Sequence, residues 1–310
     1  MSMGPVDGLP VICIMGPTGS GKSSLALELA KELSGEIISA DSMQIYKELS
    51  IGTAKPAEED LAAVPHHLVN IASIRERFDV FSFRRMAEEA VGSIRAKGKY
   101  PIVAGGTGLY MRALLYGLDE LPADPVLRKE LDALYDHEKG ALLLRERMAK
   151  EAPRDLELFG SNLRKLIRAL EVRLLTGREM GELQKSWKEK PPRPDGKSFV
   201  LVWEKEALLA RLQLRCRQML KEGWIEEAKE LFALGLEKAP TAWQVLGYRE
   251  IAQYLAGEFP FDKLEEKILT ATWQYARRQN TWFRTQHPEA IRLQMPDPSA
   301  VEKIKTCLGI

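Results

Sequence analysis

Short apolar runs alternate with longer helical patterns along the first third of the chain. Continuous apolar runs at 11–15, 37–40 and 100–106 are typical of buried strands in a parallel sheet. Apolar residues at helical spacing follow the first run, as Leu25, Leu29 and Leu33, and recur across 83–94. Strand and helix therefore alternate, which predicts an α/β fold with a parallel sheet flanked by helices.

The middle of the chain carries helical patterns without strands, from Leu118 to about Lys190. This stretch ends at the proline-rich KEKPPRPDGKS, after which FVLVW resembles a strand that returns to the sheet. We therefore expect a core of 1–117 and 195–310, divided by an all-helical insertion at 118–194. Three further helices are predicted after the returning strand, in the segments LLARLQLRCRQMLKEG, WIEEAKELFALGL and KILTATWQYARRQNTWFRT.

Composition narrows the class of protein. The 310 residues are 45% hydrophobic and 29% charged, which is ordinary for a globular protein. No apolar run approaches the roughly 20 residues of a membrane span, and MSMGPVDGLP lacks the features of a signal peptide. We expect a cytoplasmic protein that does not enter the membrane. Its three distant cysteines, Cys13, Cys216 and Cys307, indicate reduced thiols rather than a disulfide framework or a zinc site.

The segment GPTGSGKS after the first strand predicts a phosphate site. Gly16, Gly21, Lys22 and Ser23 satisfy the pattern G-x-x-x-x-G-K-[ST] between a strand and a helix. The glycines allow backbone N–H groups to point into one concavity, to which the helix N-terminus adds positive charge. Lys22 supplies a full charge, and the Ser23 hydroxyl can reach Mg²⁺. The segment therefore suits a diphosphate or triphosphate and indicates a P-loop NTPase-like core.

A carboxylate, Asp41, directly follows the second strand. Because ligands bind at the carboxyl ends of strands in open α/β sheets, we expect Asp41 to face the same crevice as the phosphate loop. Three roles are open to it: a general base near the bound phosphate, a magnesium ligand, or the N-cap of a short turn. Position alone does not distinguish them.

The third strand runs into glycines instead of the aspartate that holds magnesium in ATP-hydrolysing enzymes with a phosphate loop. Gly105, Gly106, Thr107 and Gly108 follow it and open another helix. Such a turn brings backbone close to a ligand, with Thr107 as a donor to phosphate or base, or it serves tight packing of strand and helix. Both interpretations stay open.

The last predicted helix mixes basic and aromatic residues. Lys267, Arg277, Arg278 and Arg284 lie among Trp273, Tyr275, Trp282 and Phe283. This mixture suits RNA, but the same spacing fits a helix with aromatic residues in the core and arginines in solvent, which we favour slightly. Arg164, Lys165 and Arg168 in the insertion raise the same question, and a net charge of +1 does not decide it. His66 and His67 are interpreted as structural or surface residues.

Eight motifs, taken together and in order, give the chain a resemblance to a known family. They are GPTGSGKSSLALELA, ISADSMQIYKELSIGTAKP, VPHHLV, PIVAGGTGLYMRALLYGL, NLRKLIRALEV, RLQLRCRQML, QVLGYREI and ATWQYARRQNTWFR. The chain resembles the bacterial tRNA dimethylallyltransferases, also called tRNA isopentenyltransferases, over nearly its whole length. The phosphate loop alone is generic, whereas ADSMQIY with GGTGLY and LGYREI is highly specific.

The resemblance implies a reaction and its partners. Members of the family transfer a dimethylallyl group from dimethylallyl diphosphate to the exocyclic amine of the adenosine 3′ of the anticodon, and release diphosphate. It thus implies dimethylallyl diphosphate, the tRNA anticodon stem-loop and Mg²⁺ as ligands, and we expect a monomer. The adenine would be turned out of its stack into a channel through the core.

The resemblance also assigns roles to individual residues. The diphosphate would be held by Gly16, Pro17, Thr18, Gly19, Ser20, Gly21, Lys22 and Ser23, with Ser23 on Mg²⁺. Asp41 would take the proton of the amine, Thr107 would contact the nucleotide, and Arg215 or Arg211 would clamp the leaving group. The tRNA-contacting positions would be Asp41, Ser42, Met43, Gln44, Thr107, Arg128 or its neighbour Lys129, Lys165, Leu166, Ile167, Arg168, Ala169, Gly247, Tyr248 and Arg249.

Two other functions remain possible from the residues alone. A small-molecule or nucleotide kinase shares the strand, phosphate loop and parallel sheet, and would use Asp41 to deprotonate an acceptor hydroxyl. A non-catalytic RNA-binding module would bind tRNA without turnover. Asp41 beside a complete phosphate loop argues against the module.

Overall fold

The computed structural model describes residues 8–119, 121–184 and 190–310. The chain forms two compact units. The first combines the segment that ends at Leu115 with Arg193–Ile310, and the second is Tyr116–Pro192. The sequence places these boundaries at 118 and 194.

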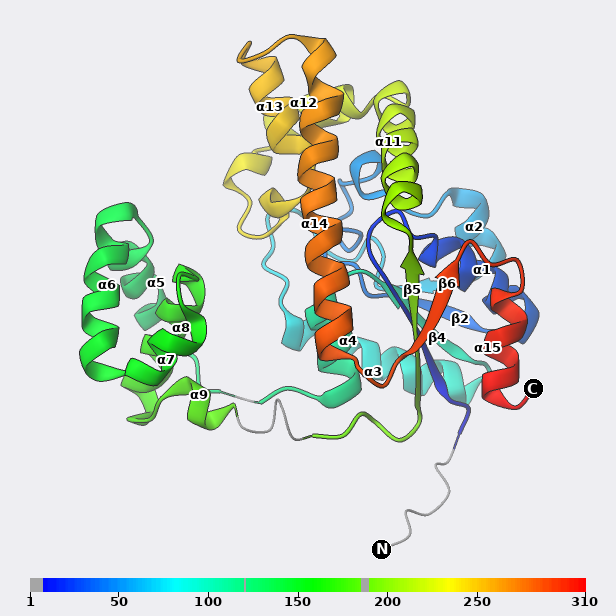
Figure 1. The fold of residues 1–310 in the computed structure, drawn as a ribbon, viewed down its shortest axis with the longest axis horizontal. Helices are drawn as coiled ribbons and strands as arrows, with labels where there is room; N and C mark the ends of the chain where they lie inside the picture. Colours follow the sequence, from blue (N-terminus) through cyan, green and yellow to red (C-terminus); the bar gives the residue numbers. More distant parts are fainter. Residues whose placement is uncertain (1–7, 120, 185–189) are drawn as a thin grey trace, which may run out of the picture. The chain divides into compact units, whose positions relative to one another are not determined.

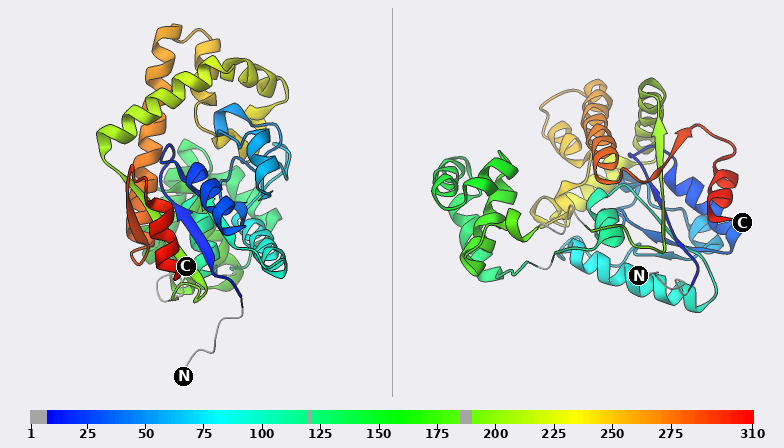
Figure 2. Two further views of the ribbon diagram at one scale, coloured as in Figure 1. Left: turned by 90° about the vertical axis from the view of Figure 1, so that its right-hand side faces the viewer. Right: turned by 60° about the horizontal axis from the view of Figure 1, so that its bottom comes forward.

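A six-stranded sheet forms the centre of the first unit (Figure 1). Its strands are β1 (Val11–Met15), β2 (Glu36–Ser39), β3 (His66–His67), β4 (Pro101–Gly105), β5 (Gly196–Trp203) and β6 (Ile291–Met295). They lie in the order β3-β2-β4-β1-β5-β6, and every neighbouring pair is parallel. Strand β5, although it follows the whole second unit in sequence, lies beside β1 (Figure 2). The predicted α/β class with a parallel sheet flanked by helices is confirmed.

Register brings three strand ends to one edge of the sheet. Met15 of β1 lies beside Gly105 of β4, and Ser39 of β2 lies beside Ala104. The phosphate loop, Asp41 and the glycine turn follow these strands directly. Consequently their side chains and backbone amides meet at the carboxyl edge, where open α/β sheets bind ligands.

Helices cover both faces of the sheet. α1 (Lys22–Leu33) and α15 (Ala300–Leu308) pack on one face, where Leu29 and Ile304 join the apolar cluster of Ile12 and Phe199. α3 (Val80–Ala96) contacts β2 and β4, and α4 (Gly108–Tyr116) follows β4. The apolar runs β1 and β4 are buried at every position, which is why they read as continuous rather than alternating.

A second cluster lies beyond the carboxyl edge of the sheet. It is formed by α11 (Lys205–Lys221), α12 (Trp224–Ala233), α13 (Tyr248–Leu255) and α14 (Leu264–Gln286). The short helices η2 (Leu236–Lys238), η3 (Ala242–Gln244) and η4 (Phe261–Lys263) lie between these helices in sequence, whereas η1 (Ile51–Thr53) and α2 (Glu58–Ala63) belong to the segment after β2. Trp224 and Tyr248 pack against Tyr46 and Leu49 from the segment after β2. This packing fixes the loops around the site to the C-terminal helices.

The second unit consists of helices in its described residues. They are α5 (Pro125–Tyr135), α6 (Glu138–Glu151), α7 (Pro153–Phe159), α8 (Leu163–Thr176) and α9 (Met180–Leu183). Leu166, Ile167 and Ala169 of α8 have exposed fractions of 0 to 1% and belong to the core of this unit. The side chains of these three residues hold α8 against its neighbours, so they do not make the tRNA contacts predicted for their positions.

Besides α2, α13 and the short helices η1 to η4, three further elements of the first unit were not predicted. Strand β3 contains His66 and His67, so these histidines are structural, as expected. His67 Nε2 lies 2.8 Å from a carboxylate oxygen of buried Glu36, which also pairs with Lys97 and Lys99 at 3.0 Å. The other two are β6 and α15, beyond the last predicted helix. Within the described part of the chain, no helix is both long and apolar enough to cross a membrane.

Candidate functional site

The phosphate loop connects β1 to α1 through residues that require unusual backbone conformations. Gly19 and Gly21 have φ values of 75° and 88°, in the left-handed region that side chains disfavour. A Cβ atom at Gly19 would also lie 2.6 Å from Leu212 of α11. The glycines therefore allow the loop to turn tightly under α11 and to direct its amides toward one concavity.

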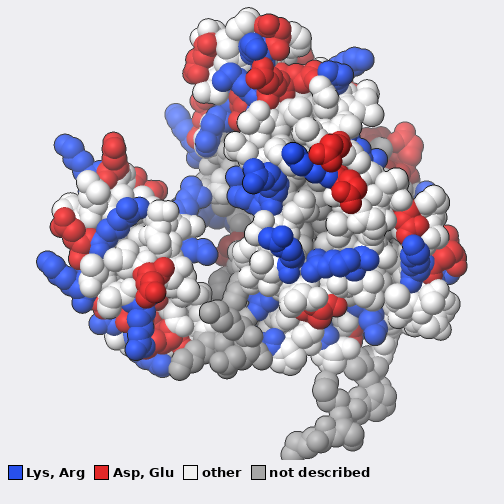
Figure 3. Space-filling view, viewed as in Figure 1, with Lys and Arg blue, Asp and Glu red and all other residues white. Residues whose placement is uncertain are grey.

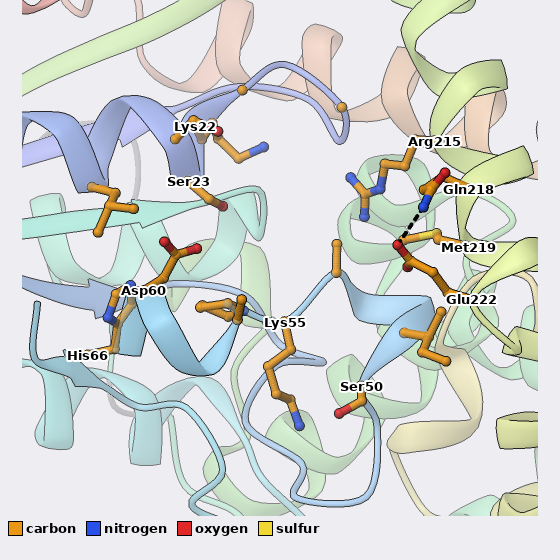
Figure 4. A pocket seen from close by; sticks show the side chains of 18 of the residues that line it. Lys22, Ser23, Ser50, Lys55, Asp60, His66, Arg215, Gln218, Met219 and Glu222 are labelled. Atoms are coloured by element: carbon orange, nitrogen blue, oxygen red, sulfur yellow. Dashed lines mark hydrogen bonds between the residues drawn. The ribbon is translucent and has the colours of Figure 1, made fainter. Parts of the chain in front are cut away.

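Two cavities meet at this loop. The larger, of about 1180 Å³, is bounded by the loop, the start of α1, α11 and the segment 50–60. The smaller, of about 350 Å³, is bounded by Asp41–Gln44, the turn after β4 and part of α14. Lys22, Ser23, Ala54 and Arg215 line both. In Figure 4, Lys22 and Arg215 reach into the larger cavity from α1 and α11, with Ser50 and Lys55 on another wall.

Lys22 is partly exposed and its side chain folds back onto the phosphate loop. Its Nζ donates to the carbonyl oxygen of Pro17 at 2.6 Å. Burial lowers the pKa of Lys22 to about 7; nearby Asp41 acts in the opposite direction, and Arg215 lowers the pKa further. The site therefore holds a cation that only an anionic partner stabilises fully.

Both candidate arginines contact the phosphate loop. Arg215 Nη1 donates to Thr18 Oγ1 at 3.2 Å, and Arg211 Nε donates to the carbonyl oxygen of Gly19 at 3.0 Å. Arg211 also lies over the Trp203 ring, 4.5 Å from its centre. Burial lowers the pKa of Arg215, whereas the charge of Asp41 acts to raise it. Only Arg215 of the two lines both cavities, which favours it as the clamp.

Asp41 lies on the wall of the smaller cavity together with Lys22 and Arg215. Its Oδ1 accepts the N–H of Met43 at 2.9 Å, so the carboxylate also caps the turn after β2. The structure thus brings Asp41 to the phosphate loop, as its place after the strand predicts. Capping and catalysis are compatible here, because a carboxylate accepts more than one hydrogen bond.

Thr107 joins the turns after β2 and β4. Its Oγ1 accepts the N–H of Ser42 at 3.0 Å and donates to Ser42 Oγ at 3.2 Å. Gln44, which is buried, donates to the carbonyl oxygens of Thr53 and Ala54. Both side chains thus hold the backbone beside Asp41, and their assigned contacts to tRNA remain predictions.

The glycine turn after β4 shows the tight packing of the two roles that the sequence left open, and it also lies on a cavity wall. A Cβ atom at Gly105 would lie 2.1 Å from the carbonyl oxygen of Ala40, and one at Gly106 would lie 2.4 Å from Gln279 Nε2. The packing is therefore tight enough to demand glycine. Gly105 and Gly106 also line the smaller cavity, so the same turn exposes backbone to a ligand there.

Gln279 is a site residue that the sequence did not reveal. Its Oε1 accepts the N–H of Thr18 at 2.8 Å, and its Nε2 donates to the carbonyl oxygen of Gly106 at 2.8 Å. One buried side chain of α14 therefore bridges the phosphate loop and the glycine turn. No local pattern marks this residue, because its partners are far away in sequence.

Helix α14 divides its aromatic and basic residues between two environments. Phe283 is buried and Trp273 packs beside buried Ala276, whereas Arg277 and Arg284 are exposed. Lys and Arg side chains gather over this helix on the face shown in Figure 3. The interpretation of core aromatics with solvated arginines fits most of the helix. Tyr275 and Arg278 depart from it, because they line the smaller cavity.

The LGYREI segment contains a further correction. Tyr248, predicted to contact tRNA, has an exposed fraction of 0% and packs against Trp224 with ring centres 5.8 Å apart. Its side chain cannot meet RNA in this fold. Gly247, with φ 88°, is also held in place, since a Cβ atom there would lie 2.3 Å from Trp224. Only Arg249 of the three is exposed, with its guanidinium 5.8 Å from the centre of the Trp243 ring.

The predicted basic contacts of the second unit fall into two groups. Arg164 and Lys165 are exposed on α8. Arg128 and Arg168 instead pair with Glu171, whose side chain is 1% exposed, and the Arg168 pair measures 2.6 Å. Burial alone would raise the pKa of Glu171, but hydrogen bonds from Arg168 and Arg128 and from the backbone of Asp124 lower it overall. These two arginines therefore hold the unit together.

The phosphate loop also provides what a magnesium ion would need. In the residues that the structure describes, no three His, Cys, Asp or Glu side chains come together as a metal cage. Exposed Ser23 lines both cavities at the start of α1. The Ser23 hydroxyl could supply one oxygen to Mg²⁺, which keeps several waters and takes other ligands from the phosphates of a substrate.

Comparison with known proteins places this site in a family. The family model described as IPP transferase matches residues 44–286, and that described as isopentenyl transferase matches residues 9–76. The chain belongs to the IPP transferase family.

Relatives of this IPP transferase carry a more specific name. It is 43% identical to "tRNA dimethylallyltransferase 1" of Citrifermentans bemidjiense over 89% of each chain. It is 39% identical to the "tRNA dimethylallyltransferase" of Thermus thermophilus, covering 93% of each chain. These matches extend over both units.

Solved structures agree with the family. The full-length tRNA isopentenylpyrophosphate transferase of Bacillus halodurans superposes with a TM-score of 0.70 at 33% identity, covering 97% of this chain and 94% of that one. A eukaryotic dimethylallyltransferase acting on tRNA superposes with a TM-score of 0.80 at 27% identity, covering 96% and 78% respectively.

Proposed function

We propose that this protein transfers a dimethylallyl group from dimethylallyl diphosphate to the exocyclic N6 amine of the tRNA adenosine 3′-adjacent to the anticodon, releasing diphosphate. The observation that carries the proposal is the shared cavity of Asp41, Lys22 and Arg215, in a chain whose relatives are named tRNA dimethylallyltransferases. We further propose that it acts as a monomer. We place this activity in the cytoplasm.

The donor diphosphate would lie at the phosphate loop, between the two cavities. Loop amides, Lys22 and Arg215 there face the oxygens on which negative charge grows as the allylic C–O bond breaks. The side-chain carbonyl oxygen of Gln279 accepts the N–H of Thr18 and thereby fixes the shape of the loop. These groups are in place before the reaction, so little reorganisation is needed when the leaving group departs.

The acceptor adenine would enter the smaller cavity. Its amine attacks the allylic carbon, a C–N bond forms as the C–O bond breaks, and the amine proton passes to Asp41. Asp41 lies between the cations of the phosphate loop and the turn that Thr107 holds. Tyr275 also lines this cavity, and its ring would pack against the base. Unstacking the base costs a few kcal/mol and is easier in an anticodon loop.

Mg²⁺ would be held by Ser23 and by the diphosphate itself. When bound, it would neutralise charge on the diphosphate as the leaving group forms. Lys22 and Arg215 act on the same oxygens, so the residues of this chain supply part of that neutralisation directly.

A small-molecule or nucleotide kinase is the less well supported function. β4 ends at Gly105 and continues as Gly106 and Thr107, where ATP-hydrolysing enzymes with a phosphate loop carry a magnesium-holding aspartate. The relatives favour the transferase as well. Consumption of adenosine triphosphate with a small acceptor, and no diphosphate release with tRNA, would reverse this preference.

One measurement of the product tests the proposal. Unmodified tRNA incubated with the protein, Mg²⁺ and dimethylallyl diphosphate is digested to nucleosides and examined by mass spectrometry. We expect one added dimethylallyl group on adenosine, at a single position of the tRNA, with one diphosphate released for each group added. If no such nucleoside forms while the protein is folded, the proposed function is wrong.

Exposed basic residues of α8 provide a prediction for tRNA binding. Arg164→Glu with Lys165→Glu should weaken tRNA binding. It should also reduce the steepness of the plot of log binding constant against log salt concentration by about 1 to 2, because fewer phosphate contacts release fewer counterions on binding. Arg168 is left intact because its reversal would leave buried Glu171 facing another carboxylate, at a cost of about 3–5 kcal/mol in stability.

A matched pair on α6 controls for net charge. Arg145→Glu with Lys150→Glu makes the same charge change at exposed positions of the same unit. We expect it to alter tRNA affinity less than the α8 pair, with donor affinity unchanged in both. Equal losses for the two pairs would show a general charge effect in place of local contacts on α8.

A further inference from the structure

A short loop forms part of the wall of both cavities. We call residues 50–54 the 50–54 loop; it contains η1. Ser50, Ile51 and Ala54 line the larger cavity, and Gly52, Thr53 and Ala54 line the smaller one. Ala54 lines both cavities and has φ 46°, in the left-handed region that residues with a side chain disfavour. Such a conformation persists only where its surroundings hold it in place.

A single carboxylate holds the loop from the side of α12. The oxygens of Glu227 accept the N–H groups of three successive residues, Ser50 at 3.2 Å, Ile51 at 2.7 Å and Gly52 at 3.2 Å. Three donors directed at one carboxylate give charge-assisted hydrogen bonds, which are about twice as strong as neutral ones.

Tyr248 completes the arrangement from α13. Its hydroxyl donates to the same Glu227 oxygen that accepts the N–H of Gly52. Burial, and next the charge of Glu227, raise the pKa of Tyr248, which favours the protonated hydroxyl that donates this bond. The tyrosine thus orients the carboxylate that orients the loop.

The fit around the loop leaves no room for displacement on this side. A Cβ atom at Gly52 would lie 2.3 Å from Trp224 Nε1 and 2.5 Å from the Tyr248 hydroxyl oxygen. On the other side, Gln44 Nε2 donates to the carbonyl oxygens of Thr53 at 3.3 Å and Ala54 at 3.2 Å. Backbone N–H and C=O groups of the loop are therefore both held by side chains from other parts of the first unit.

We propose that Glu227 and Tyr248 are positioning residues for the transfer reaction, which act by fixing the 50–54 loop across from Lys22 and Arg215. This assignment rests on the proposed function and gives the buried tyrosine of LGYREI a role other than tRNA contact. The loop, the phosphate loop and Arg215 bound the passage that the donor occupies. Since a displacement of 1 Å can cost about 10²-fold in rate, loss of this support should slow transfer without affecting tRNA binding.

Three variants separate positioning from folding. Glu227→Gln keeps the shape but replaces one acceptor oxygen by an NH₂ group that cannot accept from the loop amides. Tyr248→Phe removes only the hydroxyl. Glu226→Gln is the matched control, because this neighbour has a side-chain exposure of 68% and pairs with Lys229 on its own helix. Each variant is assayed with tRNA and dimethylallyl diphosphate, and with hydrogen exchange of the 50–54 amides.

We expect kcat/KM for the donor to fall roughly 10–100-fold in Glu227→Gln, and less in Tyr248→Phe. The KM for tRNA should stay within about twofold, and exchange of the loop amides should rise in both variants but not in Glu226→Gln. The double variant should lose less than the sum of the single losses, because both residues act through one carboxylate.

Three results would overturn the assignment. A rise in the KM for tRNA with unchanged donor parameters would restore Tyr248 to the tRNA interface. A lower melting temperature with unchanged kinetics and unchanged loop exchange would make the pair merely structural. Normal exchange of the loop amides in Glu227→Gln would show that the carboxylate does not hold them, and this readout applies even if the wild-type protein proves not to transfer dimethylallyl groups.

Discussion

Asp41→Asn is expected to leave both substrates bound and to remove most of the turnover. Asparagine fills the same space, and its Oδ1 still accepts the N–H of Met43, so the turn after β2 is preserved. It cannot take a proton from the adenine amine. Loss of a general base typically costs ~10²–10⁴-fold in rate, or about 3–5 kcal/mol of barrier. We expect the upper end, because the lone pair of the amine is delocalised into the ring and makes it a weak nucleophile.

Titration against magnesium distinguishes a base from a metal ligand. Single-turnover rate and donor affinity are measured for Asp41→Asn as Mg²⁺ is raised. A normal rate with weakened donor binding that Mg²⁺ restores would contradict the base and make Asp41 a metal ligand. Asp79→Asn is the matched control, since this exposed carboxylate also accepts one backbone N–H, from Ser82 at 2.8 Å, and Asn is an equally good N-cap.

Local pattern was enough for the elements that are buried on both faces. β1 and β4 are apolar at nearly every position and buried at all of them, so their runs stand out from the flanking helices. β3 was missed because it is two histidines long and forms an edge of the sheet. β6, on the other edge, buries Leu293 alone among exposed and half-buried residues, which leaves only a weak apolar signal.

The site residues fall into two groups. Some could be predicted from the sequence next to them, and others join the site through contacts between distant segments. The phosphate loop and Asp41 could be predicted because each directly follows a strand, and parallel strands end at one edge. Gln279 and Glu227 could not, because their bonds to Thr18 and Ile51 span 261 and 176 residues. No spacing rule links positions so far apart. Only the packing of α12 and α14 against the loops makes them part of the site.

Motif matching located segments correctly without telling which side chains face outward. In NLRKLIRAL, helical geometry places Arg164 and Lys165 in solvent and Leu166 and Ile167 in the core. A continuous range assigned to RNA must therefore contain residues that cannot reach it. Tyr248 and Arg249 show the same difference on α13. They are neighbours in sequence, but Tyr248 lies on the buried face of the helix and Arg249 on the exposed one.

The affinity for dimethylallyl diphosphate should fall as pH rises above about 7. Burial lowers the pKa of Lys22 to about 7, so its amine is charged below that pH and becomes neutral above it. A bound diphosphate favours the ammonium and raises the pKa in the complex. Between these two pKa values, Kd should increase up to about tenfold per pH unit, which corresponds to about 1.4 kcal/mol. Phosphate groups, whose second pKa is about 6, are already ionised there and do not produce this trend.

Calorimetry measures directly how many protons the protein takes up when the donor binds. At pH 8.5, binding of dimethylallyl diphosphate without tRNA should take up close to one proton, seen as a difference in heat between buffers with different ionisation enthalpies. Lys22→Gln should bind the donor weakly, with no proton uptake and a Kd that stays flat from pH 7 to pH 9. A flat Kd in the wild-type protein over that range would mean that Lys22 is already charged before the donor binds. Asp41 would then be the reason, since it is the carboxylate whose charge opposes the effect of burial on Lys22, and Asp41→Asn should restore the pH dependence.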